Sequence, residues 1–173
     1  MRLQADGRER TWGNGGRLED LYVRHAGSAG RLAYVLTGNR TAAEDLVQEA
    51  FIRVASRGRR EVEGDAFAAY LRRTIVNLHI SWMRRRKLER AYLRRETGRP
   101  ATDVPPDVEA QQDMRRRLLA LPPRQRAALV LRYYEDLSEA ETADVLGCSR
   151  AAAKSLVSRG IEALRTDMRG EDR

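Results

Sequence analysis

The sequence DLSEAETADVLGCSRAAAKSLVSRGIEAL, residues 136–164, decides the fold of the C-terminal part of the chain. Ser138 and Glu141 form a capping box, in which each side chain can bond the backbone N–H of the other residue, and it predicts the start of a helix. Gly147 can adopt the left-handed conformation that ends a helix, and Ser149 can cap a second one. The pattern therefore predicts two helices joined by a short turn, as in a DNA-binding helix-turn-helix.

The second helix of this pair carries the polar groups that DNA recognition requires. Arginine, lysine and serine side chains donate hydrogen bonds to phosphate oxygens and to base edges. The donors on the exposed side of this helix are Arg150, Lys154, Ser155, Ser158 and Arg159. An ordinary helical hairpin in a core needs no such row, so we favour the DNA-binding interpretation.

Composition narrows the classes of protein to which the chain can belong. Its 173 residues suffice for one medium or two small domains, and a net charge of +8 predicts an anionic partner. The single cysteine, Cys148, excludes an internal disulfide and a thiolate metal site. We find no catalytic or metal-ligand pattern, no signal peptide and no apolar run long enough to span a membrane. We therefore expect a cytoplasmic, non-enzymatic protein with no cofactor and no metal.

A second capped helix, expected from Thr41 to about Ser56, has two different faces. Thr41 and Glu44 can form its capping box. Its buried stripe consists of Leu46, Val47, Ala50, Phe51 and Val54. The other face carries Asp45, Gln48, Glu49, Ile52 and Arg53. Acidic groups there can compensate the helix dipole, or they can form a docking surface for a basic helix of a partner.

Apolar spacing predicts a long helix from about Ala66 to at least Leu88. Its core stripe consists of Phe67, Leu71, Ile75, Leu78 and Trp82. Beside that stripe lie Arg73, Asn77, Ser81 and Arg84, and the helix continues into the basic run of residues 84–87. Such a row can be merely solvated, but its mixture of cations and hydrogen-bonding groups suits a nucleic-acid strand.

Three prolines in residues 97–109 predict a linker, after which Pro123 can begin a further helix.

The order of these segments resembles that of sigma-70 family RNA polymerase sigma factors of the extracytoplasmic-function (ECF) type. The resemblance is carried by AEDLVQEAFIR at 43–53, AFAAYLRRTIVNLHISWMR at 66–84, and the segment 121–164 that begins LPPRQRAALVLRYYEDLSEAETADVLGCS. It implies an all-α fold of two small helical domains joined by a flexible linker. The implied divisions are a disordered tail at 1–16, sigma region 2 at 17–96, the linker at 97–109, the sigma region 4 helix-turn-helix at 110–168 and a tail at 169–173.

The resemblance also implies a function and the residues that perform it. The chain would bind the clamp helices and flap of core RNA polymerase and direct transcription initiation at promoter −10 and −35 elements. The residues expected to bind core polymerase are Asp45, Gln48, Glu49 and Ile52. Those expected to bind −10 DNA are Glu61, Gly64, Asp65, Phe67, Arg73, Asn77, Ser81, Arg84 and Arg85. Those expected to bind −35 DNA are Arg124, Arg126, Arg150, Lys154, Ser155, Ser158 and Arg159.

Two other functions remain open on sequence alone. A stand-alone helix-turn-helix regulator would need no polymerase, and the acidic helix face would then have no role. An RNA-binding or membrane-surface protein could use the basic row, but it leaves the helix-turn-helix unexplained. Co-purification with core polymerase distinguishes a sigma factor from both of these alternatives. The resemblance also implies an anti-sigma partner. We expect no membrane contact, and we expect the chain to lie in the nucleoid with polymerase.

Overall fold

The computed structural model describes residues 15–56, 64–97 and 111–171, and within these ranges the chain is built from helices and short turns. In chain order they are α1 (Gly15–Thr37), α2 (Arg40–Ser56), α3 (Gly64–Thr97), α4 (Gln111–Ala120), α5 (Pro123–Leu129), the π-helix η1 (Val130–Tyr134), α6 (Glu139–Leu146) and α7 (Arg150–Glu171). The all-α prediction is confirmed. The expected linker, apart from residue 97, and the loop residue Glu61 lie outside the described residues.

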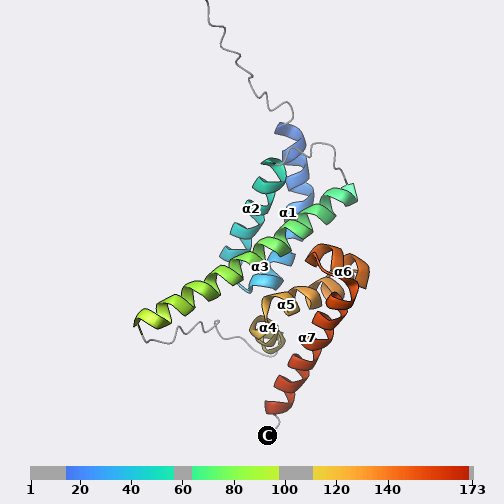
Figure 1. The fold of residues 1–173 in the computed structure, drawn as a ribbon. Coiled ribbons are helices and arrows are strands. Elements are labelled where there is room, and N and C mark those ends of the chain that lie inside the picture. Colours follow the sequence, from blue (N-terminus) through green and yellow to red (C-terminus); the bar gives the residue numbers. More distant parts are fainter. Residues whose placement is uncertain (1–14, 57–63, 98–110, 172–173) are drawn as a thin grey trace, which may run out of the picture.

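Helices α1, α2 and α3 form an N-terminal bundle, in which each helix contacts the other two (Figure 1). Its centre is apolar, and the fully buried residues include Ala33, Leu36, Ala50 and Ile75. α1 runs through Gly27 and Gly30 as one helix, although two glycines weaken a helix by roughly 1 kcal/mol each. Packing against α2 and α3 therefore outweighs the low helix propensity of the middle of α1.

The corner between α1 and α2 differs in detail from the sequence prediction. Gly38 has φ +70°, a conformation that favours glycine. The next residue, Asn39, caps α2, because its Oδ1 accepts a hydrogen bond from the Ala42 N–H at 2.9 Å. The expected capping box of Thr41 and Glu44 is therefore wrong, and Glu44 instead forms an exposed ion pair with Arg40 at 3.1 Å.

Helices α4 to α7 form the C-terminal group, and the predicted caps and turn of its helix-turn-helix are confirmed. The Ser138–Glu141 capping box is present, and Gly147 has φ 60° at the end of α6. The Ser149 Oγ accepts from the Ala152 N–H at 3.2 Å and so caps α7. α5 begins at Pro123, as predicted, but it changes to the π-helix η1 before Tyr134. α7 continues to Glu171, beyond the expected domain end at residue 168.

The two groups of helices pack against each other, which the sequence did not predict. α3 contacts α5 and α6, while α1 contacts α4 and η1 (Figure 1). Val76, His79 and Ile80 of α3 lie outside the expected core stripe, yet all three are buried. Buried residues of both groups consequently belong to one continuous core.

Candidate partner and nucleic-acid interfaces

The acidic face of α2 is exposed along its whole length. Asp45, Gln48, Glu49 and Ile52 are all exposed, and their spacing of three and four residues puts them on one side of the helix. Ile52 is 63% exposed, so an apolar side chain lies in water among the acidic groups. Glu49 pairs with Arg53 at 2.7 Å.

The start of α2 bears on the helix-dipole interpretation of this acidity. The helix begins at Arg40 and has no acidic residue in its first turn. The dipole effect falls off within the first turn of a helix, so it does not account for Asp45 or Glu49. The docking surface for a basic partner stays a prediction, and the exposure of Ile52 among carboxylates is compatible with it.

The basic row of α3 also faces solvent. The exposed members are Arg73, Asn77, Ser81, Arg84 and Arg85, and Asp65 is exposed in the first turn of the helix. The row lies beside the buried side of α3, on which Val76 and Ile80 pack. Gly64 is the first residue of α3. This part of the helix thus presents a continuous set of cations and hydrogen-bonding groups.

Phe67 does not belong to this exposed row. Its side chain is 2% exposed, and its ring lies 6.2 Å from that of Phe51 and 5.0 Å from that of His25, measured between centroids. The expectation that Phe67 contacts −10 DNA is therefore corrected. It anchors the first turn of α3 in the bundle, because apolar burial there is more favourable than exposure.

The expected reading face of α7 is exposed as well. It presents Lys154, Ser155, Ser158 and Arg159, together with Arg150 at the first turn. Arg150 lies 3.6 Å from the Glu139 carboxylate, and the Arg159 Nε donates to the Ser155 carbonyl at 3.2 Å. Both arginines remain exposed despite these contacts. Phosphate oxygens can therefore take the place of the Glu139 carboxylate and the Ser155 carbonyl as their partners.

Two arginines of α5 were expected at the −35 DNA, and the structure corrects one of them. Arg126 is 3% exposed, and its guanidinium donates to the carbonyls of Leu36 at 2.7 Å and Leu121 at 3.2 Å. Burial lowers the pKa of Arg126 to about 10. Because its guanidinium is enclosed between the two helical groups, Arg126 is not accessible to DNA in this arrangement. Arg124 is half-buried and donates to the Leu146 carbonyl at 3.1 Å, at the end of α6.

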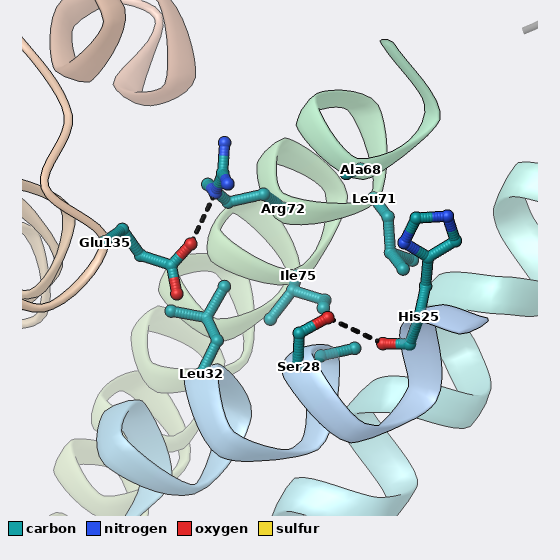
Figure 2. A pocket seen from close by; sticks show the side chains of 9 residues that line it. His25, Ser28, Leu32, Ala68, Leu71, Arg72, Ile75 and Glu135 are labelled. Atoms are coloured by element: carbon teal, nitrogen blue, oxygen red, sulfur yellow. Dashed lines mark hydrogen bonds and ion pairs between the residues drawn. The ribbon is translucent and has the colours of Figure 1, made fainter. Parts of the chain in front are cut away.

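Sequence reasoning missed the polar contacts between the two groups. Arg72 of α3 pairs with Glu135 at 2.6 Å, and Figure 2 shows this pair at one side of a pocket that also receives His25 and Ser28. Arg115 of α4 donates to the Gly38 carbonyl. The only signal in the sequence was a second helical stripe on α3, residues 72, 76, 79 and 80, beside the stripe already assigned to the core.

Among residues 15–56, 64–97 and 111–171, no group of three or more His, Cys, Asp or Glu side chains is placed to hold a metal ion. In the same part of the chain, no helix combines the length and apolar content needed to cross a membrane.

Comparison with known proteins decides the family. The model of sigma-70 region 2 matches residues 21–89, and the model of sigma-70 region 4 matches residues 111–164. The chain belongs to the sigma-70 family. Region 2 therefore corresponds to the bundle of α1–α3, and region 4 to the group of α4–α7.

Individual relatives place the chain among the ECF sigma factors. It is 37% identical to the ECF RNA polymerase sigma factor SigE of Mycolicibacterium smegmatis over 85% of the chain, and it spans 60% of that relative's length. It is 33% identical to the RNA polymerase sigma-E factor of Streptomyces coelicolor, with 75% of the chain and 73% of the relative covered. It is 30% identical to the ECF factor SigW of Bacillus subtilis, with 80% and 82% covered.

A solved structure agrees on the fold. The sigma factor RpoE of Bartonella quintana, in complex with the anti-sigma factor NepR, matches with a TM-score of 0.69 and 24% identity. The match covers 88% of this chain and 97% of that one, so it includes both helical groups.

Proposed function

We propose that this ECF sigma factor binds core RNA polymerase and directs it to promoters that contain a −10 and a −35 element. The observation that carries the proposal is the simultaneous exposure of three chemically distinct faces on α2, α3 and α7. A stand-alone helix-turn-helix regulator would use the α7 face alone. The match to both sigma regions supports the sigma factor and leaves that alternative without support.

The α2 face is the proposed polymerase contact. Asp45, Gln48, Glu49 and Ile52 combine carboxylates with an exposed apolar residue, which suits a basic, amphipathic helix such as those of the polymerase clamp. Electrostatic complementarity of this kind favours encounter and selects the correct partner. The proposed contact of region 4 is the flap of the polymerase. The proposed cellular location is the cytoplasm, where the chain would act with nucleoid-bound polymerase.

The α3 and α7 faces are the proposed promoter readers. Lys154, Ser155 and Ser158 would reach base edges of the −35 duplex, with Arg150 and Arg159 on phosphates. The α3 row would hold the non-template strand of the −10 element, and the loop before α3 would accept an unpaired base. Extraction of a base costs a few kcal/mol, which backbone and stacking contacts can offset.

Division of the site between two readers has a physical consequence. Each reader contacts a short DNA segment and binds it weakly by itself. Once one reader is bound, the second contact becomes intramolecular and gains from a high effective concentration. Specificity then requires both elements. An anti-sigma partner, as proposed, would act by preventing the chain from binding the −10 and −35 elements at the same time.

Run-off transcription with core RNA polymerase from a related bacterium tests the proposal. The chain should direct initiation at specific start sites on genomic DNA. Reversing the charge of the α2 face with Asp45→Arg and Glu49→Arg should reduce polymerase binding and transcription by at least tenfold.

The matched control is Glu19→Arg with Asp20→Arg, because these exposed acids lie on α1 and the change of net charge is the same. This control should retain transcription. If the α2 and α1 variants lose activity equally, or if neither does, the assignment of the polymerase contact is refuted.

A further inference from the structure

We propose that Thr142, a buried residue of α6, positions Lys154 on the proposed reading face of α7 through an ordered water molecule in the cavity between the two helices. Thr142 is then a positioning residue, because it acts on DNA recognition only through Lys154. The inference deepens the proposed function and rests on it for the role of Lys154. The water site itself is a property of the free chain.

The cavity lies between η1, α6 and α7, and it has a volume of about 30 Å³. A buried water needs roughly 10–15 Å³ of such space, so the cavity is large enough to hold a water. α6 and α7 contact each other at the helix-turn-helix (Figure 1). The residues that line the cavity are Arg132, Glu139, Thr142, Ala153, Lys154 and Val157.

The hydroxyl of Thr142 is buried without a hydrogen-bond partner. The residue is 0% exposed, and within the described part of the chain its Oγ1 has no partner. Its backbone N–H bonds the Ser138 carbonyl at 2.9 Å, so the backbone donor is satisfied while the hydroxyl is not. A buried hydroxyl without a partner destabilises a fold, and buried waters commonly bond such groups. Because Thr142 lines the cavity, a water there can bond its hydroxyl.

Charged side chains of the cavity supply the other partners of the water. A buried water typically makes about three hydrogen bonds. The Glu139 carboxylate can accept one of them, and the Lys154 ammonium can donate one. The guanidinium of Arg132 already donates to the Leu137 carbonyl. Together with the Thr142 hydroxyl, the Glu139 and Lys154 groups therefore provide the partners that such a water needs.

Lys154 connects the cavity with the reading face, because it lines the cavity and is nevertheless exposed. A lysine side chain is a flexible four-carbon stem, and holding it in one conformation costs entropy. A water fixed on the buried Thr142 hydroxyl gives the ammonium a defined partner, and such a bridge is enthalpically close to a direct hydrogen bond. The Lys154 ammonium is thereby preorganised before it meets a base edge.

Promoter binding by the holoenzyme tests the proposal. Thr142→Val removes the hydroxyl and keeps the shape of the side chain. On promoters that vary at the −35 position read by Lys154, this variant should discriminate between bases about fivefold less well than the native chain, a size typical of coupled neighbouring groups. Thr142→Ser keeps the hydroxyl and should keep the discrimination. Thr166→Val is the matched control, because the exposed Thr166 hydroxyl bonds the Glu162 carbonyl of its own helix.

A double-mutant cycle shows whether Thr142 acts through Lys154. In a Lys154→Ala background, Thr142→Val should leave the remaining base preference unchanged. A general structural role would instead weaken binding in both backgrounds, and urea denaturation would show a loss of stability. Unchanged discrimination in Thr142→Val, or an equal loss in both backgrounds, would overturn the proposal.

A crystal structure of the free, full-length chain gives a readout that does not depend on polymerase. The native chain should hold a water within hydrogen-bond distance of the Thr142 Oγ1, and Thr142→Val should lack it. A native crystal without this water refutes the proposal, whatever the DNA binding shows. If the native holoenzyme has no −35 preference, the proposed function fails and the role of Lys154 fails with it, while the crystal structure still decides whether the water site exists.

Discussion

At the scale of single residues, His79 illustrates how the contact between α3 and α5 changes the chemistry of a side chain. It is fully buried in α3, and burial together with the positive charge of Arg126 lowers the pKa of His79 to about 3. The imidazole therefore stays neutral in the folded chain at physiological pH. In the unfolded chain the same group titrates near 6.5. Protonation of His79 therefore favours the unfolded state over the folded state.

The pKa difference of His79 between the folded and unfolded states predicts that the free energy of unfolding falls at acidic pH. Below pH 6.5 the unfolded state binds a proton that the folded state does not, so stability present above pH 6.5 is lost as the pH falls toward 3. The loss from His79 is up to about 1.4 kcal/mol per pH unit, or about 2 kcal/mol at pH 5. Urea unfolding at pH 8 and pH 5 should show this difference in the native chain and lose most of it in His79→Phe. A His79 variant with the native pH dependence would contradict the assignment.

At the scale of elements, short-range signals account for the helix-turn-helix. The Ser138 Oγ accepts from the Glu141 N–H at 3.2 Å, and the Glu141 carboxylate accepts from the Ser138 N–H at 2.8 Å. These hydrogen bonds with Ser138 hold the pKa of Glu141 below its ordinary value. Gly147 ends α6 with φ 60°, and a Cβ there would meet nothing within 4 Å. The turn thus depends on backbone conformation and caps rather than on packing of the glycine.

Two substitutions measure these signals separately. Ser138→Ala should lower the free energy of unfolding by about 1 kcal/mol through loss of the cap. Gly147→Ala should lower it by about 1–2 kcal/mol, because alanine is strained in the left-handed conformation. Ser155→Ala, on the exposed side of α7, is the control and should change stability by less than about 0.5 kcal/mol. Urea denaturation measures all three, and a Gly147→Ala variant as stable as the native chain would show that the turn relaxes.

At the scale of the whole molecule, function depends on where the regions lie relative to each other. The structure presents the α2, α3 and α7 faces to solvent, while α5 contacts both α3 and α7 and so links the two helical groups. A net charge of +8 favours DNA in general, while base contacts supply sequence preference. Promoter binding by the chain together with core polymerase, as proposed, would combine these two contributions.

Promoter binding by the assembled holoenzyme should distinguish the two kinds of α7 contact. Lys154→Ala should cost about 1–3 kcal/mol and relax preference at one −35 position. Arg159→Ala should weaken binding to all sequences and reduce the slope of log affinity against log salt concentration by about 1. Affinities measured on a set of −35 variants at several salt concentrations check both. Unchanged base preference in Lys154→Ala would exclude that residue from the reading face.

The sequence by itself determined most of the helices, the caps of α6 and α7, and the family, because those features depend on neighbours a few residues apart. The Ser138 box, the Gly147 turn and the buried stripe of α2 were all readable from spacing. Only the tertiary structure decided that Phe67 is an anchor, that Arg126 lies between the regions and that His79 is buried. Burial depends on which distant helix covers a side chain, and the spacing of residues within one helix does not identify that distant helix.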